Sequence, residues 1–256
     1  MAANVSRLCD GGAKKYKSLN IVQMIDRITN AQITSESPAF AKPLLGAVPS
    51  VVYNEDCVEG LKRFSDNHFD LAIVDPPYGI GASEMQMGNN SKKKWSKGKN
   101  WDNETPTAEY WEQLFRVSKN QIVWGGNYFE LPLTKGWIVW DKNNGESGFA
   151  DGEMAWTSFN KPMKIKKIHW TGSASNWEDT NGKIHPTQKP LKLYKWLLKE
   201  FAVEGNLILD THLGSGSIRL ACNELHFAFT GFEIDQEYYE KQEKRFNDFK
   251  SQLRLF

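Results

Sequence analysis

Four consecutive residues, Asp75-Pro76-Pro77-Tyr78, combine the groups needed to hold an amino group of a heterocyclic base. Such a nitrogen is a poor nucleophile because its lone pair is delocalised into the ring. The Asp75 carboxylate and the Pro76 carbonyl can accept its two N–H groups, and proline fixes φ near about −65°, which sets the direction of that carbonyl. Tyr78 supplies an aromatic face for a planar base. The tetrapeptide therefore predicts catalysis by positioning and electrostatics, without a covalent intermediate. The alternative is an ordinary Pro-Pro turn.

The elements around this tetrapeptide predict an α/β protein. A short apolar run, residues 69–74, precedes it and is typical of a central strand buried on both faces. Further strands are expected at 121–124 and 137–141, and a helix is expected to begin with Thr105 as N-cap and Pro106 at its first position. This alternation indicates a doubly wound, mostly parallel sheet, in which ligands bind at the carboxyl ends of strands.

A second group of residues follows a strand near the C-terminus. The strand 207–210 ends at Asp210, a turn containing Gly214 and Gly216 follows, and the next strand ends at Glu233. This is the layout of a Rossmann-type nucleoside site, in which the glycines admit a ligand close to the backbone and the acid binds ribose hydroxyls. A tight strand-to-helix turn and a solvated strand end are the alternatives. Phosphate binding is disfavoured, because the turn lacks both GxGxxG and a P-loop lysine.

The composition excludes several classes of protein. The chain has 256 residues, 40% of them hydrophobic, and a formal net charge of +1, so nucleic-acid contacts must come from local basic patches. Three cysteines, Cys9, Cys57 and Cys222, are far apart and support neither a disulfide framework nor a metal site. This cysteine usage favours a reducing, cytoplasmic compartment, and no apolar run predicts a leader or a membrane span.

The domain organisation follows from breaks in the strand and helix rhythm. Residues 1–50 are expected to form an arm or linker, and 51–256 one catalytic domain. Within that domain, 79–103 is a long polar loop expected to be flexible and to face the substrate, since loops of this length are usually functional or disordered. Residues 145–182 form an inserted recognition region, which we expect to contain an antiparallel strand pair at 153–159 and 161–170.

The two motifs together resemble the amino-methylating DNA methyltransferases that use S-adenosylmethionine. The acceptor motif comes first and the cofactor turn last, with a target-recognition region between them, which resembles the circularly permuted beta group. The resemblance covers about residues 51–248 and implies the Rossmann-like, class I methyltransferase fold. Segments that also resemble this family, including its phage and prophage members, are Asn54-Glu55-Asp56-Cys57, Trp124-Gly125-Gly126-Asn127-Tyr128-Phe129, Trp140-Asp141-Lys142 and His185-Pro186-Thr187-Gln188-Lys189-Pro190.

The resemblance implies a role for each matching residue. Asp75 and the Pro76 carbonyl hold the target amino group, and Tyr78 stacks on the base. The chain departs from the family at Thr211-His212, where Pro-Phe is usual, which puts the packing of the cofactor turn in question. The residues that the resemblance places at the cofactor are Asp56 near the adenine, Glu233 at the ribose, Thr187 and Lys189 near the carboxylate, and Cys57, Asp75, Asp210, Gly214, Gly216 and Ser217.

The implied function is site-specific methylation of adenine N6 in double-stranded DNA, because Asp rather than Ser or Asn precedes Pro-Pro-Tyr. A base inside a duplex cannot reach such a pocket, so the resemblance implies base flipping. A cytosine-N4 DNA enzyme, an RNA amino-methyltransferase and a noncatalytic nucleic-acid-binding relative are the alternatives. A homodimer and a cognate restriction endonuclease remain open as partners, since the sequence has no decisive dimer stripe.

Two basic segments are candidates for backbone contacts that offset the cost of flipping. Trp95 in the first of them either wedges into the gap left by the flipped base or anchors its loop. Residues 149–159, with Asp151 and Glu153, either approach the pocket or read bases, or else belong to a packed hairpin. A solvated surface is the alternative for the lysines. The candidate DNA-binding residues are Lys92, Lys93, Lys94, Trp95, Lys97 and Lys99 in the first segment, and Lys164, Lys166 and Lys167 in the second.

Overall fold

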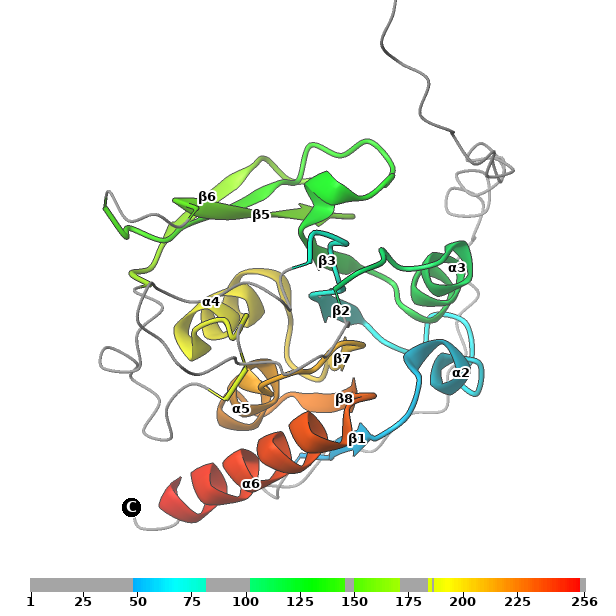
Figure 1. Ribbon diagram of the computed structural model, residues 1–256, viewed down its shortest axis with the longest axis vertical. Coiled ribbons are helices and arrows are strands. Elements are labelled where there is room, and N and C mark those ends of the chain that lie inside the picture. Colours follow the sequence, from blue (N-terminus) through cyan, green and yellow to red (C-terminus); the bar gives the residue numbers. More distant parts are fainter. Residues whose placement is uncertain (1–47, 82–101, 146–149, 171–183, 186, 254–256) are drawn as a thin grey trace, which may run out of the picture. The chain divides into compact units, whose positions relative to one another are not determined.

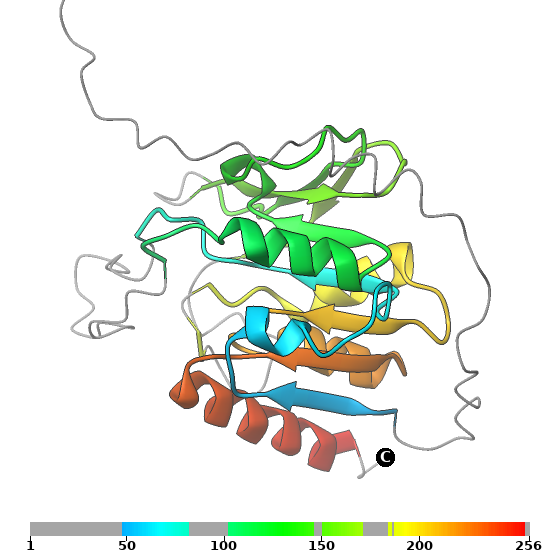
Figure 2. The ribbon, with the colours of Figure 1, turned by 90° about the vertical axis from the view of Figure 1, so that its right-hand side faces the viewer.

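The described part of this protein is built on a mixed sheet with helices on both faces (Figures 1 and 2). All the described residues belong to the unit formed by residues 41–256. Within them, no helix is long and apolar enough to cross a membrane. The computed structural model describes residues 48–81, 102–145, 150–170, 184–185 and 187–253.

The described part of the chain forms an eight-stranded sheet with the order β1-β8-β7-β2-β3-β5-β4-β6. Neighbouring strands are parallel except at β5, which runs antiparallel to both β3 and β4. The predicted doubly wound, mostly parallel sheet is therefore confirmed. The strands are β1 Ser50–Tyr53, β2 Leu71–Val74, β3 Gln121–Trp124, β4 Ile138–Asp141, β5 Gly152–Thr157, β6 Lys164–Lys167, β7 Leu207–Asp210 and β8 Ala228–Phe232.

Helices cover the two faces of the sheet as separate layers (Figure 1). One layer contains α2 Cys57–Leu61 and α3 Ala108–Val117, and the other contains α4 Leu191–Phe201 and α5 Ser217–Glu224, with α6 Gln236–Leu253 packed beside α5. A short 3₁₀ helix, η2 Gly126–Tyr128, follows β3. The opposite strand faces pack against these layers, so each layer closes its own apolar core.

The two cores explain why the central strands read as continuous apolar runs. Ile73 and Trp124 pack toward Leu197 of α4, whereas Val74 packs toward Leu114 of α3. Every residue of β2 and of β3 is buried. A strand buried on both faces has no polar alternation, and this is the pattern from which the sequence predicted a central strand before Asp75.

The start of α3 differs from the sequence prediction. Thr107, not Thr105, is the N-cap, and its hydroxyl oxygen accepts a hydrogen bond from the Tyr110 backbone N–H at 3.3 Å. Pro106 consequently precedes the helix instead of opening it. The prediction was wrong by two residues because either threonine can cap, and only Thr107 lies three residues before an amide that needs an acceptor.

The predicted antiparallel pair in the inserted region is also wrong. Residues 153–159 do supply a strand, β5, but it pairs with β3 and β4, and β6 pairs with β4 in parallel. Both strands therefore extend the central sheet. Alternating apolar and basic residues indicate a strand with one covered face, but they do not determine which neighbour supplies its hydrogen bonds.

The register of β2 against β7 brings the two sequence motifs together. The strands are parallel, with Leu71 opposite Ile208 and Ala72 opposite Leu209. Parallel neighbours end at the same edge of the sheet, so the residues that follow Val74 and those that follow Leu209 emerge side by side. The acceptor motif and the glycine turn, far apart in the sequence, consequently share one end of the sheet.

Candidate active site

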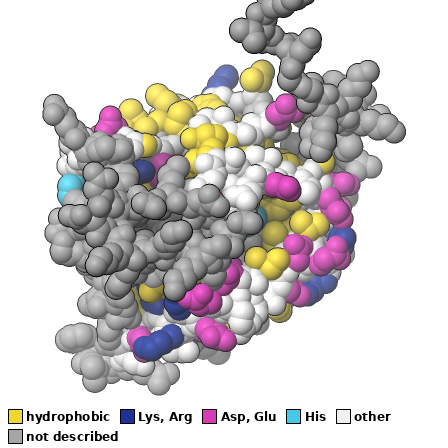
Figure 3. Space-filling model, viewed as in Figure 1, with side chains coloured by type: hydrophobic (Ala, Val, Ile, Leu, Met, Phe, Trp, Pro, Cys, Tyr) yellow, Lys and Arg dark blue, Asp and Glu magenta, His cyan; other side chains and the backbone are white. Residues whose placement is uncertain are grey.

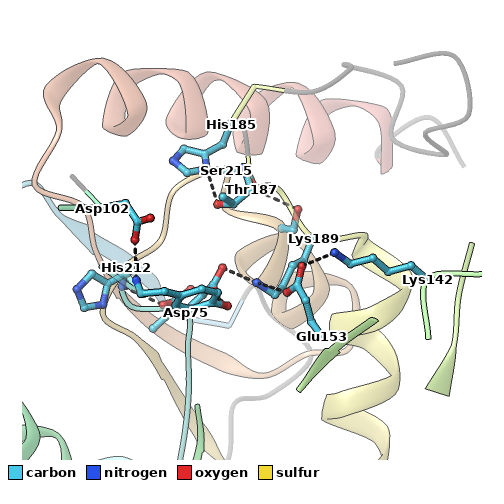
Figure 4. A network of polar contacts seen from close by, with 12 residues as sticks. Asp75, Asp102, Lys142, Glu153, His185, Thr187, Lys189, His212 and Ser215 are labelled. Atoms are coloured by element: carbon cyan, nitrogen blue, oxygen red, sulfur yellow. Dashed lines mark hydrogen bonds and ion pairs between the residues drawn. The ribbon is translucent and has the colours of Figure 1, made fainter. Parts of the chain in front are cut away.

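Asp75 is held from two sides at the carboxyl end of β2. The Tyr78 hydroxyl donates a hydrogen bond to Oδ1 of Asp75 at 2.6 Å, and the Lys189 ammonium donates to Oδ2 at 2.5 Å (Figure 4). The Asp75 side chain remains 17% exposed. A carboxylate oxygen has two lone pairs, so both oxygens can still accept another hydrogen bond from a ligand.

The ring of Tyr78 is packed between backbone and a second tyrosine. It stacks on Tyr128 with 5.0 Å between ring centroids and an angle of 13° between the planes. Gly125 lies against it with φ +66°, a left-handed conformation that favours glycine, and a Cβ atom there would overlap the Tyr78 ring. Gly125 was not recognised as a site residue, although the Gly-Gly pair after an apolar strand was a visible signal.

Replacing Gly125 with alanine should therefore disable the tyrosine. We expect Gly125→Ala to reduce turnover by about 100-fold or more, since the new methyl group forces Tyr78 out of its place and a 1 Å misplacement can cost about that much. Gly205→Ala is the matched control, because Gly205 also has a left-handed φ, +85°, but its Cβ would meet nothing within 4 Å. Steady-state kinetics and thermal melts of both variants test this, and equal turnover in the two would contradict it.

Asp102 fastens the backbone of the acceptor motif. Its Oδ1 accepts hydrogen bonds from the backbone N–H groups of Tyr78 at 2.6 Å and Gly79 at 3.1 Å. Its own carbonyl accepts from the Gly81 N–H at 3.0 Å, and the residue is 1% exposed. The two ends of the long predicted loop are thus tied together beside Asp75. Sequence analysis missed Asp102, because no local pattern distinguishes it from other loop aspartates.

Loss of this fastening should lower turnover without removing the catalytic groups. Asp102→Ala leaves two backbone N–H groups without their acceptor, and we expect turnover to fall by roughly 10- to 100-fold. Asp102→Asn keeps the side-chain oxygen and should recover most of the activity. Comparing kcat for the two variants checks the prediction; equal losses would show that the negative charge, rather than the hydrogen bonds, matters.

A cavity of about 300 Å³ joins the ends of β2, β7 and β8. Carboxylates from three separate segments line it, and they make the site suitable for a positively charged ligand. Aromatic and backbone groups complete the wall. The predicted site residues that line it are Asp56, Cys57, Asp75, Pro77, Thr187, Lys189, Gly214 and Glu233. Asp210 is not among the lining residues, but Thr211, His212 and Leu213 of the turn that follows it are.

Glu233 lines this cavity, and Glu233 and Asp210 both accept hydrogen bonds from backbone turns beside it. Oδ1 of Asp210 accepts the His212 N–H at 3.0 Å, whereas Glu233 accepts the backbone N–H groups of Gly214 at 2.8 Å and Asp235 at 2.9 Å. Burial raises the pKa of Asp210 to about 8, with a smaller contribution from the neighbouring carboxylates of Asp75 and Glu233, although the hydrogen bond from the His212 N–H acts in the opposite direction. Asp210 is therefore ready to release a proton when a cation approaches.

The unusual Thr211-His212 pair is built into a polar contact with α3. The Thr211 hydroxyl lies 2.8 Å from the Tyr110 hydroxyl and 2.9 Å from Nδ1 of His212. The Tyr110 and His212 rings meet edge to face, with 5.3 Å between centroids. Burial lowers the pKa of His212 to about 4, so its ring is neutral at physiological pH. Hydroxyl and imidazole contacts thus hold this turn where Pro-Phe was expected.

Other predicted cofactor residues have local roles as well. Oδ1 of Asp56 accepts the backbone N–H groups of Val58 and Glu59 as the N-cap of α2. Burial raises the pKa of Cys57 to about 12, so this residue is a thiol and not a nucleophile. Thr187 contacts the ring of His185 through its hydroxyl at 3.0 Å.

Two of the predicted cofactor residues lie behind the cavity. Gly216 has φ +72° at the start of α5 and packs against Gln242. The Ser217 hydroxyl accepts a hydrogen bond from Arg245 of α6 at 3.1 Å. These residues shape the glycine turn from the α6 side, whereas Gly214 and Ser215 line the cavity itself.

A chain of ionic groups extends from Asp75 to the end of β4 (Figure 4). Lys189 pairs with Asp75 and also with Glu153 of β5, at 3.1 Å, and Glu153 pairs in turn with Lys142 at 2.7 Å. The sequence indicated Glu153 as a residue that either approaches the pocket or packs in a hairpin. In the structure, Lys189 lies between Glu153 and Asp75 and pairs with both. Lys142 was quoted only within the Trp140-Asp141-Lys142 segment.

Comparison with known proteins agrees with this geometry. Residues 123–244 match the family model N6_N4_Mtase, described as DNA methylase. The type II methyltransferase M.HpaI of Haemophilus parainfluenzae is 26% identical over 77% of this chain and 75% of its own length. For M2.MboI of Moraxella bovis these values are 24%, 79% and 92%. The chain resembles the N6/N4-type DNA methylases.

Solved structures support the methylase fold. The complex of M1.HpyAVI with SAM superposes with a TM-score of 0.50 and 22% identity, over 76% of this chain and 98% of that one. The PvuII cytosine-N4-specific DNA methyltransferase gives a TM-score of 0.51 and 15% identity, over 78% and 87% of the two chains. The resemblance and the fold class predicted from the motifs are thus confirmed.

The predicted DNA contacts of this methylase-like chain fall into two groups. Lys164 is paired with Glu200 of α4 at 2.9 Å, Lys166 lies 5.7 Å from the Trp196 ring, and Lys167 is exposed. In the view of Figure 3, basic side chains of the described residues are interspersed with acidic ones. The remaining candidates, Lys92, Lys93, Lys94, Trp95, Lys97 and Lys99, lie outside the described residues.

Proposed function

We propose that this protein transfers a methyl group from S-adenosylmethionine to the N6 amino group of adenine in double-stranded DNA. One observation carries the proposal: Asp75 of the acceptor motif and the glycine turn after Asp210 line the same cavity. An acceptor site and a donor site on one wall allow direct transfer, because binding brings the two reactants into contact. The similarity to DNA methylases supports this choice of reaction.

Asp75 and Pro76 prepare the acceptor in this proposal. The carboxylate and the carbonyl accept the two N–H groups of the base, which favours a tetrahedral nitrogen with its lone pair directed at the methyl group. The Lys189 ammonium donates a hydrogen bond to Oδ2 of Asp75 at 2.5 Å and thereby fixes the orientation of the carboxylate. The Tyr78 ring stacks on Tyr128 in this structure. In the proposed complex, a flipped base takes the place of Tyr128 against the Tyr78 ring.

The cavity residues fit a cationic nucleoside. S-adenosylmethionine supplies an electrophilic methyl group on a positively charged sulfur. Glu233 provides negative charge at the cavity, the Asp210 carboxyl at the end of β7 can ionise when a cation binds, and Gly214, with φ +51°, lets the backbone approach a ligand. The buried Gln188 Nε2 has no hydrogen-bond partner among the described residues and is available to a ligand carboxylate. Glu233 is suited to the ribose and Asp56 to the adenine, as the family resemblance implies.

The choice of DNA and adenine rests on the motif and on the relatives. Aspartate before Pro-Pro-Tyr favours adenine, the matching family model is described as DNA methylase, and the similar proteins are type II methyltransferases by name. Residues 79–103 and 145–182 are our candidates for contacts to the duplex, within a catalytic domain that we place at 51–256. A DNA substrate is also consistent with a cytoplasmic location.

The test is methyl transfer from labelled S-adenosylmethionine to unmethylated genomic DNA, followed by nucleoside analysis. N6-methyladenine in the product would support the reaction and the acceptor together. N4-methylcytosine would keep the mechanism and overturn the base assignment, which is the alternative that the fold shared with the PvuII enzyme suggests. Label found only in RNA, or in no nucleic acid, would overturn the proposal.

A further inference from the structure

Four charges of alternating sign form a continuous chain at the active site. It runs from Asp75 through Lys189 and Glu153 to Lys142, with N···O distances of 2.5, 3.1 and 2.7 Å. The Lys189 and Lys142 side chains are 3% and 8% exposed. The acceptor carboxylate is thus connected to β5 and to the end of β4 by ionic contacts (Figure 4).

Stability alone does not account for this arrangement. Removing charges from water is costly, and a buried ion pair is often no more stable than an apolar replacement of similar volume. Two of these positions lie against large apolar surfaces, since Lys189 is 5.2 Å from the Trp124 ring and Lys142 is 4.9 Å from the Trp170 ring. An apolar side chain would fit such surroundings. The charges therefore call for a role at Asp75.

The geometry of Lys189 indicates that role. Its ammonium donates a hydrogen bond to Oδ2 of Asp75 and is also paired with Oε2 of Glu153. Without Glu153, the ammonium is free to bridge both oxygens and to occupy the lone pairs that the target amino group needs. With Glu153, Oδ1 is left to the Tyr78 hydroxyl and to the substrate.

Lys142 balances the chain. Asp75, Lys189 and Glu153 alone would carry one excess negative charge in a buried place, which Lys142 cancels through Oε1 of Glu153. The electrostatic effects agree with this pairing. Burial opposes ionisation of Glu153, but the two lysines outweigh it and lower its pKa, and the two carboxylates likewise raise the pKa of Lys189 against the effect of burial.

We propose that Glu153 and Lys142 are positioning residues for methyl transfer, holding the Lys189 ammonium on one oxygen of Asp75 so that the other oxygen receives the target amino group. This inference rests on the proposed amino-group methylation, but not on whether the base is adenine or cytosine. Neither residue touches the substrate; both act through Lys189. Glu153 lies in β5 and Lys142 directly follows β4, so the antiparallel pairing of these strands sets their separation.

Matched variants separate this role from a purely structural one. Glu153→Gln and Lys142→Met each break the chain and should lower single-turnover kcat by roughly 10- to 100-fold, as is typical when residues that orient a catalytic group are changed. Affinity for S-adenosylmethionine, measured by calorimetry, should change by no more than about threefold. Lys142→Arg keeps the charge and should restore most of the lost turnover.

A double variant and a surface control complete the experiment. Lys142→Met combined with Glu153→Gln should lose little more than either single change, because residues that act as one unit are not additive. Lys119→Met is the control, since Lys119 pairs with Asp70 at 2.7 Å at the opposite end of β2. Thermal melts are recorded for each variant to identify any that fails to fold. If Glu153→Gln does not fold, the comparison of turnover between Lys142→Met and Lys142→Arg decides the test.

The outcomes are distinct for the two proposals. Wild-type turnover by Glu153→Gln would overturn the inference. The inference would also be overturned if turnover fell together with cofactor affinity and melting temperature, and if Lys142→Arg did not restore it. Failure of the adenine assignment would show instead in the wild-type arm, as methylated cytosine, and the variants would then be compared on that acceptor.

Discussion

Asp75→Ala should abolish methyl transfer while cofactor binding survives. We expect turnover to fall by roughly three orders of magnitude, because the variant loses the carboxylate that accepts the target N–H group and anchors Tyr78. The cofactor side of the cavity, built by the turn after β7, remains intact. Affinity for S-adenosylmethionine should therefore stay within about tenfold of wild type. Radiolabel transfer and calorimetry on the same preparation measure the two quantities.

Asp70→Asn provides the control at the other end of the same strand. Asp70 also pairs with a lysine, Lys119, and its Oδ2 accepts the Leu207 N–H at 2.9 Å, but it precedes β2 instead of following it. Its substitution should cost stability and leave turnover nearly unchanged. Normal turnover by Asp75→Ala would refute the role of Asp75, and loss of cofactor binding in that variant would move Asp75 to the donor side of the reaction.

Three of the candidate residues from sequence analysis share a structural position. Asp75, Gly214 and Glu233 each follow an apolar strand, and each lines the cavity. Local patterns are enough to identify strand ends, since apolar runs bounded by glycine and proline are recognisable without tertiary information. Parallel strands then end at one edge of the sheet. Convergence of the motifs therefore follows from strand direction alone, without knowledge of the strand order.

The residues that were missed depend on contacts between distant segments. The pairing of Glu153 with Lys189 requires β5 to lie beside β3 and the segment before α4 to pass over both. No local pattern specifies either arrangement. The same holds for Asp102, whose partners at 78 and 79 lie across a long loop, and for β6, whose neighbour was wrongly predicted.

The cofactor turn shows how tertiary contacts override a local expectation. Replacement of Pro-Phe by Thr211-His212 suggested a looser turn. The structure shows a threonine hydroxyl in contact with Tyr110, a residue of α3 on the far side of the strand layer from α4 and α5. A buried hydroxyl needs a partner, and here a tyrosine hydroxyl supplies it. The polar pair in the turn and the tyrosine on α3 form one unit that sequence analysis had no means of connecting.

Asp210→Asn should remove the pH dependence of cofactor binding. The pKa of Asp210 is raised to about 8 by burial and by the nearby carboxylates, so below this pH it is mostly neutral in the free protein. A cationic ligand favours the ionised form, and binding then releases a proton. Wild-type affinity should rise by up to about tenfold per pH unit from pH 6 to 8 and level off above. Dissociation constants of the variant and the wild type are measured at each pH and compared as a ratio, because any titration of the ligand itself affects both equally.

Stability should change in the opposite direction from binding. Asp210 has a higher pKa in the folded protein than its ordinary value of 3.8, so the folded state binds more protons between that value and about 8. The free energy of unfolding contributed by this group consequently falls as pH rises through this window. Asp210→Asn avoids the loss, so its melting temperature should match wild type near pH 4 and exceed it increasingly toward pH 8. A variant that melts below wild type at pH 8 would show that Asp210 is ionised and stabilised in the free protein, and the cavity would then hold a fixed negative charge before any cofactor binds.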